Sequence, residues 1–307
     1  MDKTDIALIW LLMINSRTPY SDLAEKLSLS VNAVHKRIQS LKESGIIKTF
    51  TARVSLAALK AVDIIVFGTS EIQLDQETVR KLQGDDHTYW VALSGGNYVY
   101  VGAYLRNISE IDSYVAFVKS EAKIADPTVG IQTSAWTEVP AREADIQKLD
   151  YRIIHAMQKD SRKVIPELSE ELAVSAKTIR RRLTRLVNEG LVDLNLEFYP
   201  DKENDIMTMM HVSLKGSADR TNAISLLTKK YSPNVIFCFI FSNLPNLVIP
   251  FVWTNSMKQL QDISKSIQAE EGVERVVPRV LYVGYMSDTW RDKLVIERAA
   301  SKTRNPD

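Results

Sequence analysis

Hydrophobic residues recur at helical spacing in three short stretches at the start of the chain. Residues 6–13, 21–27 and 31–44 each carry apolar side chains about one turn apart, and this spacing predicts three helices. Segment 46–54 then alternates between apolar and polar residues, as a half-buried strand does. Three short helices followed by one strand predict a helix-turn-helix unit with a wing.

The pattern changes period after residue 60. Alternating or continuously apolar segments predict strands at 61–72, 87–93, 98–105 and 129–136, and helical spacing predicts helices at 75–83 and 109–123. The order is strand, helix, strand, strand, helix, strand, which is the βαββαβ arrangement of ferredoxin-like domains. The same order returns later, with strands at 206–214, 234–241, 247–253 and 273–285 and helices at 218–230 and 257–269.

The chain repeats itself, which explains why both patterns occur twice. At one constant offset and without a gap, Asp5 aligns with Asp150, Ser16-Arg17 with Ser161-Arg162, Leu23 with Leu168, and Gly45 with Gly190. Ser30 and its partner Ser175 are favoured N-caps for the third helix of each copy, and Gly45 and Gly190 are typical residues just beyond its end.

We therefore expect an α+β fold in which two winged helix-turn-helix domains alternate with two ferredoxin-like domains. The expected winged helix-turn-helix domains are 1–55 and 146–198, and the expected βαββαβ domains are 56–140 and 199–287. Residues 288–307 are expected to be a C-terminal tail.

Charge and composition exclude several classes of protein. The chain has 39 Lys and Arg against 38 Asp and Glu, a net charge of +1, so it is not coated in positive charge, although a local basic face is still allowed. Its one cysteine, Cys238, excludes an internal disulfide and a cysteine zinc site and favours a reducing compartment. No apolar stretch reaches the roughly 18 residues of a membrane span, so we expect a cytoplasmic protein.

The third helix of each copy carries the candidate chemistry on the side opposite its apolar stripe. From Ser175 to Asn188 the second copy has five basic residues and no acidic one. A helix fits the major groove of DNA, where Arg and Lys donate to guanine and Asn pairs with adenine. The predicted DNA contacts are Asn32, His35, Lys36, Gln39, Lys48, Lys177, Arg180, Arg181, Thr184 and Arg185.

Other residues of the two heads are assigned different roles. Arg37 and Arg182 lie nearer the apolar stripe and are predicted to be structural or phosphate contacts. The second wing, Asp193 to Glu197, is acidic and is expected to stay off DNA. Heads that no longer read DNA and serve only as an interaction platform are a further alternative, but folding does not require so many basic residues on one exposed helix face.

These motifs resemble the Lrp/AsnC family of transcription regulators. The residues that carry the resemblance are Asp5, Ser16-Arg17, Ser21 to Ala24, Leu29-Ser30 and Glu43 to Ile47, with their counterparts in the second copy. The resemblance implies double-stranded DNA as partner, ligand-sensing and oligomerisation roles for the βαββαβ domains, and a fused pair of subunits acting as a pseudo-dimer, with further homo-oligomers left open. Because the two reading faces differ, we expect an imperfect palindrome as the operator.

The resemblance also implies a small-molecule effector, an amino acid or another metabolite, bound near the turn between the central strands. The first copy offers Gly95, Gly96, Asn97 and Tyr98 there, without the acidic residue that is usual in the family. A plain hairpin turn is the alternative interpretation of these four residues.

Sirohaem decarboxylases resemble this chain in domain layout and provide the alternative function, a tetrapyrrole enzyme. Their chemistry depends on His and Arg in the sensing-domain cavity, whereas this chain has only His87 and His211 in those domains, at different strand positions. No phosphate-binding loop, metalloprotease motif or nucleophile elbow is present. We therefore expect no catalytic residues, no metal, no cofactor and no enzyme.

Overall fold

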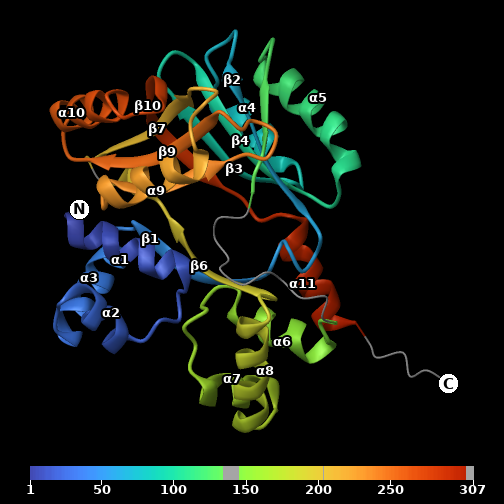
Figure 1. The fold of residues 1–307 in the computed structure, drawn as a ribbon. Helices are drawn as coiled ribbons and strands as arrows, with labels where there is room; N and C mark the ends of the chain where they lie inside the picture. The colour runs from blue at the N-terminus through green and yellow to red at the C-terminus, as the bar shows by residue number, and fades with distance from the viewer. Residues whose placement is uncertain (134–144, 203, 302–307) are drawn as a thin grey trace.

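The computed structural model describes residues 1–133, 145–202 and 204–301. Two helical heads lie on one side of a large sheet, and two paired strands run between the heads and that sheet (Figure 1). The first head contains α1 (Lys3–Ile14), α2 (Tyr20–Leu27) and α3 (Val31–Glu43), and the second contains α6 (Lys148–Met157), α7 (Ile165–Leu172) and α8 (Ala176–Asn188).

The ends of α3 and α8 follow from their sequence. The hydroxyls of Ser30 and Ser175 accept hydrogen bonds from the third backbone amide after them, which satisfies one of the unpaired donors at a helix start. Gly45 and Gly190 lie just beyond the two helices at positive φ, +77° and +64°, where a glycine has no Cβ to clash. Both predicted caps and both predicted stops are confirmed.

The strands expected to be two separate wings form one shared ribbon. β1 (Ile47–Val54) pairs antiparallel with β6 (Val192–Phe198), with Phe50 opposite Leu196 and Ala52 opposite Leu194. Local alternation identified both strands correctly but assigned each to its own head. Each strand in fact satisfies its backbone hydrogen bonds through the other copy.

Each head uses this ribbon to complete its hydrophobic core. The core of the first head includes Leu196 from the second copy, and the core of the second head includes Ala52 and Val54 from the first. These side chains are almost fully buried. Neither head therefore has a complete core without the other copy.

A second contact joins the heads directly, through the loop that follows the first helix of each. The hydroxyls of Ser16 and Ser161 are 2.5 Å apart and both side chains are fully buried. Arg17 donates to the backbone carbonyls of Ser161 and Lys163, and Arg162 donates in return to those of Ser16 and Thr18. The contact is reciprocal, as expected for an approximate twofold relation between the copies.

The large sheet combines both βαββαβ units in one structure. The first unit consists of β2 (Val62–Thr69), α4 (Gln76–Gly84), β3 (Thr88–Ser94), β4 (Tyr98–Leu105), a 3₁₀ turn η1 (Ile108–Glu110), α5 (Ile111–Ala122) and β5 (Thr128–Ile131). After a short turn η2 (Pro200–Lys202), the second consists of β7 (Ile206–Leu214), α9 (Arg220–Lys230), β8 (Val235–Ile240), β9 (Leu247–Thr254), α10 (Met257–Gln268) and β10 (Val273–Met286). The predicted α+β fold class is confirmed.

The strand order is β5-β2-β4-β3-β10-β7-β9-β8, so the units join where β3 pairs with β10. The two outer edges also meet, because Gln132 bridges to Phe241 and the amide of Ser242 donates to Ile131 at 2.8 Å. The half-sheets therefore face each other across a shared aromatic core, and α4, α5, α9 and α10 cover hydrophobic clusters of their own. No helix in the described ranges is long and apolar enough to cross a membrane.

The prediction of a C-terminal tail at 288–307 is wrong for most of that range. Residues Trp290–Ala300 form a helix, α11, that begins with a capping box between Thr289 and Asp292 and packs against α6. Val295 of α11 is fully buried in the core of the second head. The predicted strand 129–136 is seen as β5 only to Ile131, and residues 134–144 and 302–307 lie outside the described residues.

The position of Val295 gives a test of α11. Val295→Ala removes two buried methyl groups from the core of the second head and is expected to lower the free energy of unfolding by about 2 kcal/mol. Urea titration followed by circular dichroism measures the change. The matched control is Ile296→Ala, because Ile296 is next in the same helix and 50% exposed; equal losses in the two variants would contradict the packing of α11.

Candidate nucleic-acid interface

The second head presents an exposed basic face on α8. Ile179, Leu183 and Leu186 are buried against the other helices of the head. Lys177, Arg180, Arg181 and Thr184 lie on the opposite side and are exposed. Within the described ranges none of the three basic residues forms an ion pair, so their charges face solvent. The structure therefore brings these four predicted contact residues together on one helix face.

Arg185, also predicted to contact DNA, is held within its own head. Its guanidinium lies 3.1 Å from the fully buried carboxylate of Asp150 and 3.0 Å from Glu189. Arg182 also reaches Asp150, at 3.4 Å. A buried carboxylate needs such partners, because an unpaired charge away from water is costly. Arg182, expected to be a structural or a phosphate contact, thus forms an ion pair within the head, and Arg185 does the same.

The first head repeats the arrangement with different side chains. Asn32, Lys36 and Gln39 are exposed on α3, and Gln39 donates to the carboxylate of Glu43 at 2.9 Å. His35 is exposed too and packs edge-on against the ring of Tyr20. The counterpart of Arg182 is Arg37, which is 2.7 Å from Asp5 and 2.8 Å from Asp2. The ion pair between the first and third helices thus occurs in both heads.

Lys48 stands apart from the two recognition helices. It lies on β1 in the shared ribbon, with its ammonium 3.7 Å from Glu197 and 5.3 Å from the ring centre of Tyr199. These neighbours raise its pKa, the electrostatic effect of Tyr199 being the largest cause. Arg53, on the same strand, is 2.8 Å from Asp292 of α11. Arg53 therefore ties the ribbon to α11, whereas the contacts of Lys48 lie within the ribbon and directly after it.

The predicted effector residues form a tight hairpin turn. Gly96 and Asn97 both have positive φ, +70° and +55°, between β3 and β4. A Cβ on Gly95 would lie 3.0 Å from the hydroxyl of the exposed Tyr282 side chain. Tyr98 is buried beneath the guanidinium of Arg279, 3.4 Å from the ring centre. The geometry is sufficient to explain these residues as a hairpin, and their role in effector binding stays a prediction.

The two histidines of the sheet domains have different surroundings. His87 directly precedes β3. Its ring forms hydrogen bonds with Asp85 at 2.8 Å and with Arg106 at 2.9 Å, so both ring nitrogens have partners in the turn. His211 lies on β7 inside the sandwich, with its Nε2 2.7 Å from the hydroxyl of Tyr100. Burial lowers the pKa of His211 to about 4, and the nearby charge of Arg279 adds to the effect.

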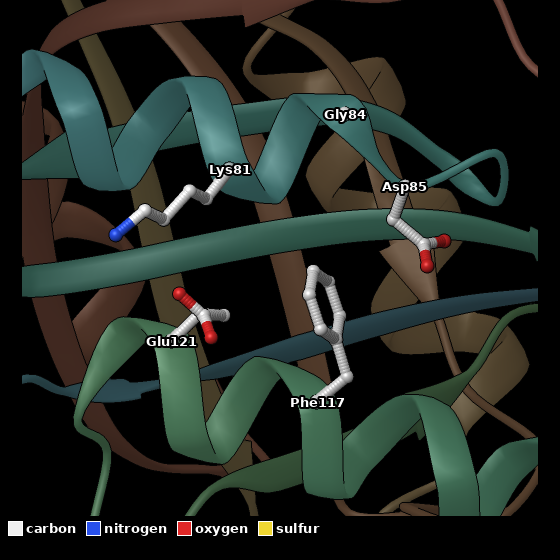
Figure 2. Close-up of a pocket in the computed structure, with 5 residues that line it drawn as sticks. All are labelled: Lys81, Gly84, Asp85, Phe117 and Glu121. Atoms are coloured by element: carbon white, nitrogen blue, oxygen red, sulfur yellow. The ribbon is translucent and has the colours of Figure 1, made fainter.

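Aromatic side chains occupy the space between the half-sheets around His211. The rings that surround it or extend this cluster belong to Phe67, Tyr98, Tyr100, Phe239, Phe241 and Trp253. Their burial is nearly complete. Figure 2 shows a different hollow, an open groove of about 420 Å³ between α4 and α5 on the outside of the first unit. Phe117 points into that groove, and Lys81 and Glu121 approach each other across it.

Comparison with known families identifies both heads. A family described as winged helix-turn-helix DNA-binding matches residues 1–48 and again residues 146–193. These ranges cover α1 to the start of β1 and α6 to the start of β6, the two heads defined by the structure. The chain is thus a protein with two winged helix-turn-helix units.

Individual relatives of the chain are transcriptional regulators. The chain is 27% identical over 138 residues to the HTH-type transcriptional regulator LysM of Sulfurisphaera tokodaii, a match covering 44% of this chain and 97% of the relative. It is 34% identical over 92 residues to the HTH-type transcriptional regulator LrpA of Pyrococcus horikoshii, which covers 27% of this chain and 65% of that protein. The chain carries the matched unit twice and is similar to HTH-type transcriptional regulators of the LysM and LrpA kind.

A solved structure matches the whole chain. The siroheme decarboxylase NirDL superposes on 97% of this chain and 98% of its own, with a TM-score of 0.58 and 12% sequence identity. At that identity the likeness establishes the fold alone. It confirms that two winged helix-turn-helix units and two ferredoxin-like units can be arranged in this way.

His211 makes the stability of the aromatic core between the half-sheets depend on pH. The pKa of His211 is near 6.5 in the unfolded chain and about 4 in the folded protein. Between these pH values unfolding takes up a proton, so the free energy of unfolding decreases as the pH falls. At pH 5 the loss is about 2 kcal/mol relative to pH 7.

The measurement is urea unfolding of wild type and His211→Gln at both pH values. Glutamine removes the titrating group and keeps a hydrogen-bonding partner for Tyr100, so the variant should lose less stability on acidification than wild type does. His155→Gln, at an exposed histidine of α6, is the matched control. Identical pH profiles for wild type and His211→Gln would contradict the burial of a neutral imidazole.

Proposed function

We propose that this chain is a sequence-specific transcription regulator whose two heads bind one double-stranded DNA site as a pseudo-dimer. The observation that carries the proposal is the exposed basic face of α8. Lys177, Arg180 and Arg181 protrude from the third helix of a helix-turn-helix head, where residues meet base edges or phosphates in the major groove. The similarity to regulators such as LysM and LrpA supports the same function.

The ribbon supports the pseudo-dimer. Because β1 and β6 complete each other's heads, and because Ser16 contacts Ser161, the heads are held in one relative arrangement. A DNA site for such a protein has two half-sites with a fixed distance between their centres, one helical turn of roughly 34 Å or a multiple of it.

The proposal includes a small-molecule effector, an amino acid or another metabolite, at the turn Gly95 to Tyr98. In support, this turn adjoins the seam between the copies, where the amide of Gly95 donates to Val280 of β10. A ligand there would contact both copies. Association into larger homo-oligomers and a location in the cytoplasm belong to the same proposal.

The alternative, a tetrapyrrole enzyme, has one point in its favour, the full-length likeness of fold to NirDL. We propose instead that the chain is not an enzyme, because Phe67, Tyr100 and Trp253 fill the space between the half-sheets with packed rings. A macrocycle would have to displace them. Incubation with a ferric porphyrin should leave no bound Soret absorbance after gel filtration, and stoichiometric uptake would favour the enzyme.

The basic face of α8 makes a direct prediction for DNA affinity. Arg180→Ala with Arg181→Ala should weaken binding to a random duplex pool about 100-fold at low salt and reduce the slope of log affinity against log salt by about two. Fluorescence anisotropy across a salt series measures both quantities.

The matched control is Arg80→Ala with Lys81→Ala, which removes the same charge from α4, away from both heads. It should change affinity only slightly. Equal losses in the two double variants would indicate attraction by net charge instead of contact through α8, and a folded wild type that does not bind at low salt would overturn the proposed function.

The operator should be an imperfect palindrome, because the two reading faces differ. In-vitro selection with wild type is expected to return unequal half-sites. The chain offers a sharp comparison, a variant in which the first head receives the second head's reading residues: Asn32→Lys, His35→Arg, Lys36→Arg and Gln39→Thr. Selection with this variant should return symmetric half-sites. Symmetric sites for wild type would contradict simultaneous reading by both heads.

A further inference from the structure

The exposed face of α3 begins with an apolar residue. Val31 directly follows the cap Ser30 and is 48% exposed. Asn32, His35 and Lys36 are exposed on the same helix. Because side chains four positions apart are neighbours on a helix, Val31 lies beside His35, next to the residues predicted to contact DNA. Val31 itself is not among those predicted contacts.

The packing and the stability of the helix do not explain a valine at this position. Helix α3 packs on its head through other side chains, Val34, Ile38 and Leu41, which are buried. Its start is stabilised by the hydroxyl of Ser30, which accepts a backbone hydrogen bond at 3.2 Å. A β-branched residue is a weaker helix former than alanine. Val31 therefore presents exposed apolar surface that the folded head does not need.

The residue after Val31 carries a side-chain amide. Asn32 is exposed, and no described residue forms a hydrogen bond with its side chain. Gln39, another amide on this face, donates to the carboxylate of Glu43 at 2.9 Å. Asn32 thus keeps both a donor and an acceptor available to a partner.

An apolar side chain next to an amide matches the chemistry of an A·T base pair. In the major groove thymine presents a 5-methyl group, which apolar side chains contact, and adenine presents an acceptor and a donor, with which asparagine pairs. Residues at the start of a recognition helix are those that meet base edges. Valine also has one strongly preferred rotamer in a helix, so it loses little conformational freedom when it makes such a contact.

The second head differs at both positions. The aligned residues on α8 are Ala176, which is shorter and only partly exposed, and Lys177, which is exposed. A lysine ammonium donates hydrogen bonds but accepts none, so it lacks the paired contact that asparagine makes with adenine. Arg180 and Arg181 suit guanine instead. Of the two recognition helices, α3 alone combines an exposed valine with an amide.

Exposure alone does not identify a base contact, as a second valine shows. Val164 is 53% exposed, but it lies at the N-cap position of α7, which is not the recognition helix of its head. Val31 differs by its place on the third helix and by its neighbour Asn32. Val164 is therefore a matched control for Val31.

We propose that the first head reads A·T sequence, with Val31 against the 5-methyl group of a thymine and Asn32 paired with the adenine of the same or the neighbouring base pair. The inference rests on the proposed function, since it requires α3 to lie in the major groove. It makes Val31 a specificity-determining residue. It also gives the unequal half-sites a chemical identity, A·T pairs under the first head and guanines under the second.

Replacing thymine by uracil in the selected operator tests the contact of Val31, because uracil lacks only the methyl group. One thymine at a time is replaced, and fluorescence anisotropy measures the affinity. With wild type, the replacement should weaken binding about fourfold at a thymine of one half-site, which is the effect of burying one methyl group. No effect at any thymine would overturn the proposal.

Variants at position 31 identify the side chain responsible. Val31→Ala should remove the preference for thymine over uracil at that place, and Val31→Ile should keep it. Val164→Ala should bind both operators as wild type does. A preference that survives unchanged in Val31→Ala would place the methyl contact on another residue and overturn the assignment.

The amide is tested through base-pair preference. At that base pair or the next, wild type should prefer A·T over G·C by at least about fivefold, and Asn32→Ala should lose this preference. Lys177→Ala, the aligned change in the second head, should leave it intact. The same preference in Asn32→Ala as in wild type would overturn the role of Asn32.

The proposed function and the base assignment fail in different ways. A folded wild type that binds no DNA overturns the proposed function and the assignment with it. Tight DNA binding that does not depend on any thymine methyl group overturns the assignment of Val31 alone, and the proposed function stands.

Discussion

The antiparallel pairing of β1 with β6 is the interaction on which the rest of the molecule depends. It satisfies the backbone groups of two strands that would otherwise be unpaired edges, and it delivers Ala52, Val54 and Leu196 to the cores of the opposite heads. The reciprocal contacts of Arg17 and Arg162 then fix the heads at a second point. The orientation of the recognition helices is consequently a property of the pair and not of either head.

Above the ribbon, the sheet domains provide rigidity through an aromatic interior. His211 illustrates the environment, because it bonds to Tyr100 and is enclosed by Phe67 and Tyr98 while remaining neutral. Packed rings with few alternative arrangements transmit displacement instead of absorbing it.

Local sequence patterns predicted most elements to within one or two residues, because helical spacing, alternation and caps such as Ser30 act over a few residues. Local patterns could not predict which distant segments pair with each other. Alternation in 46–54 shows which side chains share a face, but not that β6 is the partner strand. Likewise, a helical wheel places Arg185 beside the reading face, whereas its bond to Asp150 depends on how α6 packs. The helix α11 was not predicted, and its packing against α6 depends on contacts between segments far apart in the sequence.

The covalent linkage of the two copies has a consequence for how such a protein evolves and assembles. A dimer of separate subunits dissociates on dilution, exchanges partners with related chains, and carries every mutation in both heads at once. Here the ribbon forms within one polypeptide, so its two halves meet at a high effective concentration however scarce the protein is. Each head is also free to diverge alone. The arginines of α8 correspond to different side chains on α3, so one gene can specialise for an asymmetric stretch of DNA without a second protein.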